Sequence, residues 1–231
     1  MLFKKKEKQT KRPGIVVSDN PTSIVSEQFR TIRTNIQFSM VDQKLQTFLV
    51  TSAAPESGKT TISANLAVAF ASDGLSVLLV ATDMRKPSMH KIFEVQNTKG
   101  MTTLLSDRSK KIEDVARSSS VKNLHYITSG PLPPNPAELI SSNRMTDIIQ
   151  EMKEMYDLVI FDTPPVLAVT DAQVLSTKVD GVLFVVPQGE VKKNELDEAA
   201  DRMESVKANV LGSVLNKVDT DSDTYYYYGE E

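Results

Sequence analysis

Short, continuous runs of apolar residues recur along the chain, each bounded by polar or turn-forming residues. They occupy residues 47–52, 76–82, 124–128, 158–164, 181–187 and 209–217. Because apolar residues follow one another instead of alternating with polar ones, the runs predict strands that are buried on both faces. Helical stretches separate them. The pattern therefore predicts an α/β fold with a doubly wound, mostly parallel sheet covered by helices.

Two helical stretches have a clear apolar side. Residues 20–39 predict an amphipathic helix whose apolar side chains recur at near-helical spacing: Ile24, Phe29, Ile32, Ile36 and Phe38. The stretch after the first strand is expected to stop at Gly74, a residue type favoured beyond helix ends. It should turn four side chains inward: Ile62, Leu66, Ala69 and Phe70.

Composition and charge favour one folded domain with two different ends. The 231 residues are 40% hydrophobic, which suffices for a full core, and we expect a single domain over residues 21–218. Residues 1–20 are expected to form a basic, flexible arm and residues 219–231 an acidic tail. The arm is either a solvated segment or one attracted to an anionic membrane surface. The net charge of −3 argues against a nucleic-acid partner.

Several kinds of site are excluded by residue usage. The chain has no cysteine, which rules out disulfides and thiolate metal sites and fits a reducing cytoplasm. His90 and His125 lack ligand spacing and are expected to be structural, so a metal should be held by oxygen. No apolar run approaches the roughly 18 residues that a membrane span needs. We therefore expect a cytoplasmic protein.

The strongest chemical signal is the segment TSAAPESGKTT at residues 51–61, between the first predicted strand and a helix. Its ending, Gly58-Lys59-Thr60, has the Walker A form, in which backbone N–H groups and a helix N-terminus surround phosphate oxygens. Lys59 should reach the β- and γ-phosphates, and Thr60 should ligate Mg²⁺. The residues predicted to bind the nucleotide here are Pro55, Glu56, Ser57, Gly58, Lys59, Thr60 and Thr61.

Two other predicted strands end in charged residues. Asp162 follows four apolar residues, which is the Walker B form that supplies a carboxylate to the metal. Asp83 and Arg85 follow another strand. Ligands of open α/β sheets bind at the carboxyl ends of strands, so these residues should converge on the Walker A loop. The predicted catalytic residues are Lys59, Asp83, Arg85 and Asp162, and the predicted magnesium ligands are Thr60, Asp83 and Asp162.

Asn216 opens a second nucleotide signal, the N-K-x-D form at residues 216–219. This form is often associated with guanine, but a turn-forming Asn at a strand exit would look the same. The sequence therefore predicts a nucleotide with Mg²⁺ and leaves the choice of base open.

The acidic tail contains four of the six tyrosines in one run, Tyr225, Tyr226, Tyr227 and Tyr228. Four consecutive rings cannot all face one side of a helix or strand, so core packing does not explain the run.

These segments together resemble the bacterial tyrosine kinases, and specifically the free-standing cytoplasmic type found in Gram-positive bacteria. The similarity rests on EQFRTIRTNI at 27–36, the loop ending in GKT, DMRKP at 83–87, GPLPPNPAEL at 130–139, DTPP at 162–165 and the tyrosine cluster. It implies a P-loop domain that uses ATP and Mg²⁺ to phosphorylate tyrosines. It makes Tyr225, Tyr226, Tyr227 and Tyr228 the phosphoacceptors.

The resemblance also implies partners. Members of this family assemble as homo-oligomeric rings in which one subunit's tail enters its neighbour's site, and Glu27, Arg30 and Arg33 match the interface pattern E-x-x-R-x-x-R. A transmembrane activator with a cytoplasmic tail would recruit the kinase to the inner face of the cell membrane. Other proteins with tyrosines would be substrates, in systems that control capsule or exopolysaccharide production.

The chain departs from the family pattern at two positions. The Walker A′ segment normally carries two acids in an hhhhD-x-D pattern, but this chain has Ala81 at the first and Asp83 at the second. A methyl group cannot accept a proton or hold a metal-bound water, so we interpret the chain as a catalytically weakened variant, with the alternative that Asp83 alone suffices. Ala53 stands where the general P-loop pattern has glycine.

Two other function classes compete with a kinase. A partitioning ATPase would share the fold, but this chain has Ala54 where the signature lysine of such proteins would fall. A nucleotide-binding adaptor without catalytic activity is the second. Measurable transfer of phosphate to the chain's own tyrosines would separate the kinase from both.

Overall fold

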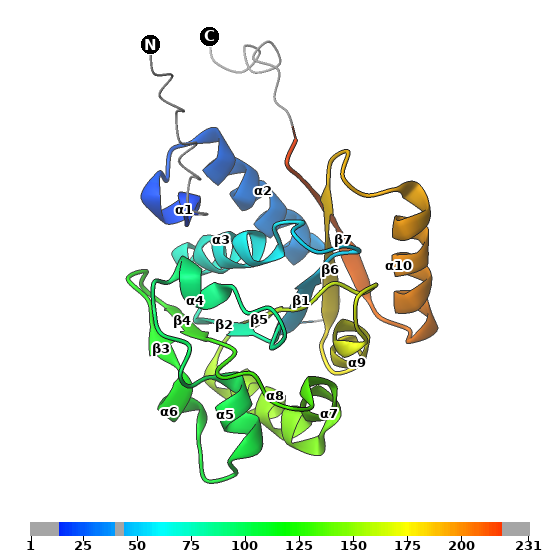
Figure 1. Cartoon of the computed structure of the whole chain (residues 1–231). Helices are drawn as coiled ribbons and strands as arrows, with labels where there is room; N and C mark the ends of the chain where they lie inside the picture. The colour runs from blue at the N-terminus through cyan, green and yellow to red at the C-terminus, as the bar shows by residue number, and fades with distance from the viewer. Residues whose placement is uncertain (1–13, 40–43, 219–231) are drawn as a thin grey trace, which may run out of the picture.

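The computed structural model describes residues 14–39 and 44–218, which form one sheet with helices on both sides (Figure 1). The strands are β1 (Thr47–Thr51), β2 (Val77–Ala81), β3 (Arg117–Ser118), β4 (Leu124–Ile127), β5 (Leu158–Asp162), β6 (Gly181–Pro187) and β7 (Val210–Asn216). The helices are α1 (Val16–Asp19), α2 (Ile24–Phe38), α3 (Lys59–Ser72), α4 (Met89–Ile92), α5 (Met101–Ser106), α6 (Ile112–Val115), α7 (Pro136–Ser141), α8 (Asn143–Met155), α9 (Asp171–Ser176) and α10 (Lys193–Ser205).

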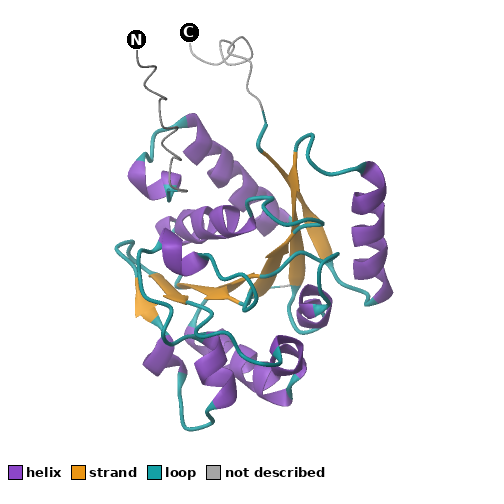
Figure 2. Cartoon of the chain, in the orientation of Figure 1, coloured by secondary structure: helices purple, strands orange, loops and turns teal. Residues whose placement is uncertain are grey.

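The sheet confirms the predicted α/β, mostly parallel architecture. Its strand order is β3-β4-β2-β5-β1-β6-β7, and every pairing is parallel except that of β3 with β4 (Figure 2). All six predicted strands are present. Strand β3 was not predicted, because its two residues have exposed or half-buried side chains and form no apolar run.

The sheet separates two apolar layers. Phe48 and Val50 of β1 pack on the side of α1, α2 and α3, whereas Leu49 packs on the side of α5, α8, α9 and α10. Successive strand residues point to opposite faces, so the same alternation fixes the face of every residue along the central strands. The carboxyl ends of β1, β2 and β5 lie at the edge of the sheet where α3 begins, and the predicted site lies there.

The N-terminal boundary predicted at residue 20 is wrong. Helix α1 already belongs to the fold, since Val17 is buried and its N–H donates to Asn65 Oδ1 of α3 at 3.1 Å. Apolar anchoring inside this segment was hidden by its charged and polar neighbours. The basic cluster of residues 4–12 and the tyrosines of the tail lie outside the described residues.

The two predicted helices differ in how far the prediction holds. In α3 the four predicted inward residues are buried, and the helix ends at Ser72, just before Gly74 with its φ of +100°. In α2, Phe29 and Ile36 are buried, but Ile24 and Phe38 at its ends are 54% and 71% exposed. The periodicity predicted that all five apolar side chains of this helix lie on one side of it. The two at its ends are nevertheless exposed, because only the middle of α2 lies over α3.

Within the described part of the chain, no helix is both long and apolar enough to cross a membrane.

Candidate functional site

The Walker A segment forms a tight loop between β1 and α3. Glu56 and Gly58 have positive φ values of +60° and +88° and flank the buried Ser57, whose hydroxyl donates to the Ala54 carbonyl at 2.7 Å. Turns of this kind aim backbone N–H groups into a concavity that suits an anion. The loop leads into the 14-residue helix α3, whose positive dipole end favours phosphate at the same place.

Ala53 fits this loop without strain. It is 1% exposed and does not have a positive φ, so its methyl group needs no unfavourable backbone conformation. The departure from glycine at this position is therefore structurally neutral.

Asn216 supports the loop from β7. Its Nδ2 donates to the Ser57 carbonyl at 2.9 Å, and a Cβ at Gly58 would lie 2.2 Å from that same nitrogen. Asn216 does not line the cavity described below, whereas Gly58 does. The structure thus gives Asn216 a positioning role, and its predicted contact with a base stays a prediction.

We expect Gly58→Ala to destabilise the chain more than Gly74→Ala. Both glycines have positive φ, but a Cβ at Gly74 would meet nothing within 4 Å, whereas one at Gly58 displaces Asn216 and breaks its hydrogen bond. The extra loss should be about 1–2 kcal/mol in the free energy of unfolding measured in urea. In an Asn216→Ala background, the two glycine substitutions should lower the free energy of unfolding by the same amount. Equal costs in the unmodified chain would contradict this role of Asn216.

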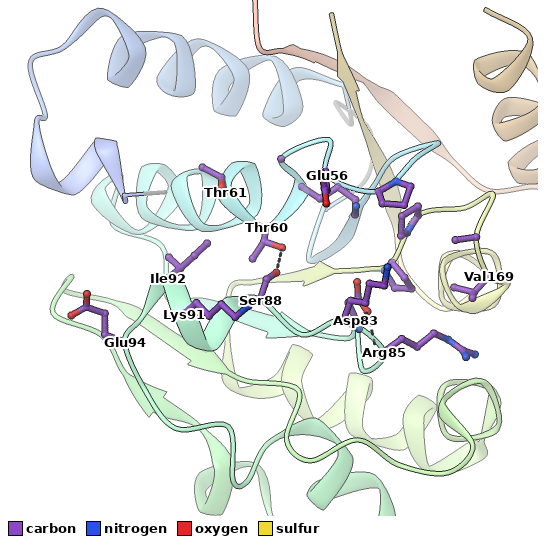
Figure 3. A pocket seen from close by; sticks show the side chains of 17 residues that line it. Glu56, Thr60, Thr61, Asp83, Arg85, Ser88, Lys91, Ile92, Glu94 and Val169 are labelled. Atoms are coloured by element: carbon purple, nitrogen blue, oxygen red, sulfur yellow. Dashed lines mark hydrogen bonds between the residues drawn. The ribbon is translucent and has the colours of Figure 1, made fainter. Parts of the chain in front are cut away.

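The first turn of α3 is joined to the end of β5. Thr60 Oγ1 donates to Asp162 Oδ2 at 2.7 Å. It also lies 2.8 Å from the Ser88 hydroxyl (Figure 3). The other carboxylate oxygen, Asp162 Oδ1, is buried without a hydrogen-bond partner among the described residues. A buried, unpaired carboxylate oxygen beside a threonine hydroxyl is an arrangement that suits a hard cation such as Mg²⁺.

The electrostatics of Lys59 and Asp162 point to the same conclusion. Burial raises the pKa of Asp162 from 3.8 to about 7, and its hydrogen bond from Thr60 and the charge of Lys59 only partly oppose this rise. Burial lowers the pKa of Lys59, opposed by the charges of Asp162 and Asp83. The site therefore carries an uncompensated desolvation cost that a bound cation and phosphate would relieve.

This cost predicts a pH dependence of stability in the absence of metal and nucleotide. The pKa of Asp162 is about 7 in the folded chain and 3.8 as its ordinary value, so the folded state binds more protons between these values and loses stability as pH rises. From pH 5 to 7 the free energy of unfolding should fall on the order of 2–3 kcal/mol because of this group.

The measurement is urea unfolding in EDTA from pH 5 to 8, compared between the chain and Asp162→Asn. Subtracting the two curves removes the opposite contribution of His90, whose pKa is lowered by burial and by Lys91. Parallel curves would show that Asp162 is already ionised at pH 5.

Asp83 belongs to a turn that follows β2. Its Oδ1 accepts the backbone N–H groups of Arg85 at 3.2 Å and Lys86 at 2.9 Å. The turn is tied to β5, because the N–H groups of Thr82 and Asp83 both donate to the Asp162 carbonyl, at 2.8 and 3.2 Å. Asp83 is half-buried and lines the cavity. These contacts hold its carboxylate in place through Oδ1, and Oδ2 can still accept a proton or a hydrogen bond.

Arg85 is held by a residue that the sequence analysis did not single out. The buried carboxylate of Asp171, at the start of α9, accepts from Arg85 Nε at 3.2 Å and from Nη2 at 3.3 Å. Figure 3 shows Arg85 extending away from Thr60. Asp171 lies six residues after the DTPP segment, and its role depends on a contact across 86 positions of sequence.

Ala81 is the last residue of β2 and lies beside Asp162 in the sheet register. It is 2% exposed and packs in the layer of α3, on the face where Asp162 reaches Thr60. Because β2 ends at Ala81, Asp83 lies beyond the strand, and strand alternation does not put the two side chains on one face. The register with Asp162 instead shows that a carboxylate at position 81 would lie beside the Walker B acid.

The predicted residues converge on one cavity of about 1080 Å³ (Figure 3). Its lining includes the loop residues from Pro55 to Thr61 except Ser57, together with Asp83 and Arg85. Ser57 is buried beneath the loop and Asp162 beneath Thr60. No sequence pattern indicated the rest of the lining, which consists of Lys86, Ser88, Lys91, Ile92, Glu94, Pro164, Pro165, Ala168 and Val169.

The three charged residues of the E-x-x-R-x-x-R pattern lie on α2, away from the cavity. Arg30 pairs with Glu27 and donates to the Pro21 carbonyl at 2.7 Å. Arg33 is engaged within the chain, since it donates to the Ala69 carbonyl at 3.2 Å and pairs with Asp73 at 3.1 Å. It therefore fastens α2 to α3, and the interface role of all three stays a prediction.

The sequence of the chain is similar to those of known proteins. Residues 55–219 match the family model described as an AAA domain. The chain is 42% identical over 231 residues to "Tyrosine-protein kinase YwqD" of Bacillus subtilis (strain 168), covering 99% of this chain and 97% of that protein. It is 40% identical to "Putative tyrosine-protein kinase CapB" of Staphylococcus aureus, covering 98% of this chain and 99% of that one.

Solved structures give the same result. The chimerical protein CapA2B2 superposes with a TM-score of 0.86 at 41% identity, over 89% of this chain and 90% of the other. The kinase domain of the Escherichia coli tyrosine kinase ETK superposes with a TM-score of 0.86 at 34% identity, over 94% and 84%. The Walker A loop, the Walker B acid and the similarity over nearly the whole chain together show that this chain belongs to the bacterial tyrosine kinases and is a protein-tyrosine kinase.

Proposed function

We propose that this kinase uses ATP and Mg²⁺ to phosphorylate the tyrosine cluster of its own C-terminal tail, and other proteins as well. The observation that carries the proposal is the contact of Thr60 with Asp162, which puts a buried carboxylate, a hydroxyl and Lys59 together at the N-terminus of α3. These are the groups that phosphoryl transfer requires for positioning and charge neutralisation.

The residues present fit both cofactor and nucleotide. Thr60 and Asp162 would hold Mg²⁺, which supplies charge neutralisation on the phosphate oxygens. Asp83, predicted as a third ligand, has Oδ1 engaged by two backbone N–H groups, so its remaining oxygen is assigned to the acceptor proton. The loop from Pro55 to Thr61 would bind the phosphates, with Lys59 as their cationic partner. Within the described residues no group of three or more His, Asp or Glu side chains is arranged to bind a metal alone. A metal here would therefore share its coordination with phosphate oxygens and water.

The transfer itself needs a base. An ordinary tyrosine hydroxyl has a pKa near about 10, so it is a poor nucleophile at neutral pH. In the proposed step its oxygen bonds to the γ-phosphorus, the bond from that phosphorus to the bridging oxygen breaks, and ADP leaves. Asp83 accepts the phenolic proton at its free Oδ2, because its other oxygen is occupied by two backbone N–H groups.

Partners complete the proposal. Following the family resemblance, the chain assembles as a ring through Glu27, Arg30 and Arg33, and a transmembrane activator recruits it to the inner face of the membrane. Each phosphate adds about −1.5 to −2 charges to an already acidic tail, so repeated phosphorylation should weaken docking of the tail and favour ring dissociation. The output would be control of capsule or exopolysaccharide synthesis.

The proposal is tested by incubating the purified chain with Mg²⁺ and ATP, followed by mass spectrometry of the C-terminal peptide. Phosphate on Tyr225 to Tyr228 that EDTA abolishes is the expected result. GTP in place of ATP should support much less transfer, and the reverse preference would favour the guanine interpretation of residues 216–219. Nucleotide hydrolysis without phosphotyrosine would favour a partitioning ATPase instead.

A further inference from the structure

The cavity has a second wall, beyond the loop and helix start that suit phosphate. Phosphates belong at the loop and the start of α3, but the cavity continues to the turn after β2, to α4 and to residues 164–169. Its volume of about 1080 Å³ exceeds the roughly 300–1,000 Å³ usual for small-molecule sites. The site therefore has room for a second reactant beside the nucleotide.

Three cations line this second wall: Arg85, Lys86 and Lys91. Arg85 is fixed in place by the buried Asp171, through Nε and Nη2, which leaves Nη1 available. Lys86 and Lys91 are exposed, and within the described residues neither has an ion-pair partner. Arg85 can thus contact a ligand from a fixed position. The two lysines can add positive charge at the ends of flexible side chains.

Three acids line the same cavity: Glu56, Asp83 and Glu94. Glu56 belongs to the phosphate-binding loop. Asp83 is engaged by the backbone of its own turn. In Figure 3, Lys91 lies beside Ser88. Glu94 lies at the far end of the cavity, away from Asp83. Within the described residues, Lys86 and Lys91 therefore remain available to an acidic ligand beside Asp83.

A tyrosine side chain is neutral and cannot form an ion pair with these cations, but acidic neighbours in the chain can. The tyrosine run of this chain has Asp221 and Asp223 before it and Glu230 and Glu231 after it. We propose that Arg85, Lys86 and Lys91 form an acceptor-binding wall that selects tyrosines flanked by acidic residues. This inference rests on the proposed function and names its substrate class, an acidic peptide.

The expected effect is a modest preference per contact. Exposed ion pairs contribute little individually, so each lysine should account for about a two- to fivefold difference in affinity. Salt should reduce the preference, because the Debye length shortens from about 10 Å at 0.1 M to about 3 Å at 1 M.

The test is fluorescence anisotropy of a labelled peptide with the full chain, Mg²⁺ and a non-hydrolysable ATP analogue. The acidic peptide copies residues 219–231 with Tyr226 kept and the other three tyrosines replaced by phenylalanine. In the matched peptide every Asp and Glu is replaced by Asn and Gln. The acidic peptide should bind about tenfold more tightly at low salt, and Lys86→Gln and Lys91→Gln should each reduce that ratio two- to fivefold.

Lys122→Gln, an exposed lysine that does not line the cavity, is the control and should leave the ratio unchanged. The lysines are chosen because removing Arg85 would leave Asp171 buried and unpaired. Equal affinity for the two peptides, or a preference that both lysine variants retain, would overturn the inference. Phosphate transfer, measured separately with ATP, reports on the proposed function: a kinase that phosphorylates both peptides equally keeps that function and loses the acidic selectivity.

Discussion

Ala81→Asp is expected to increase phosphorylation of the tail by roughly 10²–10⁴-fold at neutral pH with Mg²⁺ and ATP. Position 81 is paired with Asp162 in the sheet register and lies on the face of the sheet where Asp162 reaches Thr60. A second carboxylate there would be available to the metal or to the acceptor proton. The readout is the rate of phosphotyrosine formation on the C-terminal peptide.

Two controls separate chemistry from packing. Ala81→Asn introduces the same shape without the charge and should give no gain. Without Mg²⁺, Ala81→Asp should destabilise the chain, because two buried carboxylates on neighbouring strands repel each other and shed their water. If Ala81→Asp transfers phosphate no faster than the unmodified chain, Asp83 alone suffices as the base, and Ala81 does not weaken catalysis.

Lys59→Met is expected to reduce transfer to the tail by at least about 10²–10³-fold and to weaken nucleotide binding. Lys59 is 8% exposed at the start of α3, and its positive charge is favoured by Asp162 and Asp83. Methionine preserves an unbranched stem of similar length but removes the charge that faces the phosphates. Binding is measured with a fluorescent ATP analogue, and transfer by mass spectrometry.

Lys178→Met provides the matched control. Lys178 is a lysine bonded to the Thr146 hydroxyl and does not line the cavity, so its loss should leave both readouts unchanged. Tail phosphorylation that survives in Lys59→Met at the unmodified rate would contradict the assignment of the phosphate site to this loop.

Sequence patterns were sufficient for the parts of this fold that local chemistry specifies. Continuous apolar runs identified β1, β2, β4, β5, β6 and β7, because strands covered on both faces need no polar alternation. The Walker A segment was recognisable because its turn, lysine and threonine are adjacent in the chain. Convergence of Asp83 and Asp162 on that loop followed from the rule that strand ends meet at one edge.

Contacts between distant segments could not be predicted in the same way. Asp171 holds Arg85 and Asn216 holds Ser57 only because α9 and β7 pass beside the loop and the turn. Val17 anchors α1 in a segment whose composition indicated a flexible arm. Whether Asp83 continues the strand of Ala81 depended on where β2 ends, and strand ends are poorly defined by composition.

We expect this cavity to transfer phosphate to the tail tyrosines of a second chain, and mixing two variants measures that transfer. One chain carries Ala81→Asp with Tyr225 to Tyr228 replaced by phenylalanine, so it has a full site and no acceptors. The other carries Lys59→Met with its tyrosines intact. With Mg²⁺ and ATP, phosphotyrosine should form on the tail of the Lys59→Met chain only when its partner is present. Nucleotide binding by the partner with no phosphate on any tail tyrosine would show that this cavity does not phosphorylate the tail.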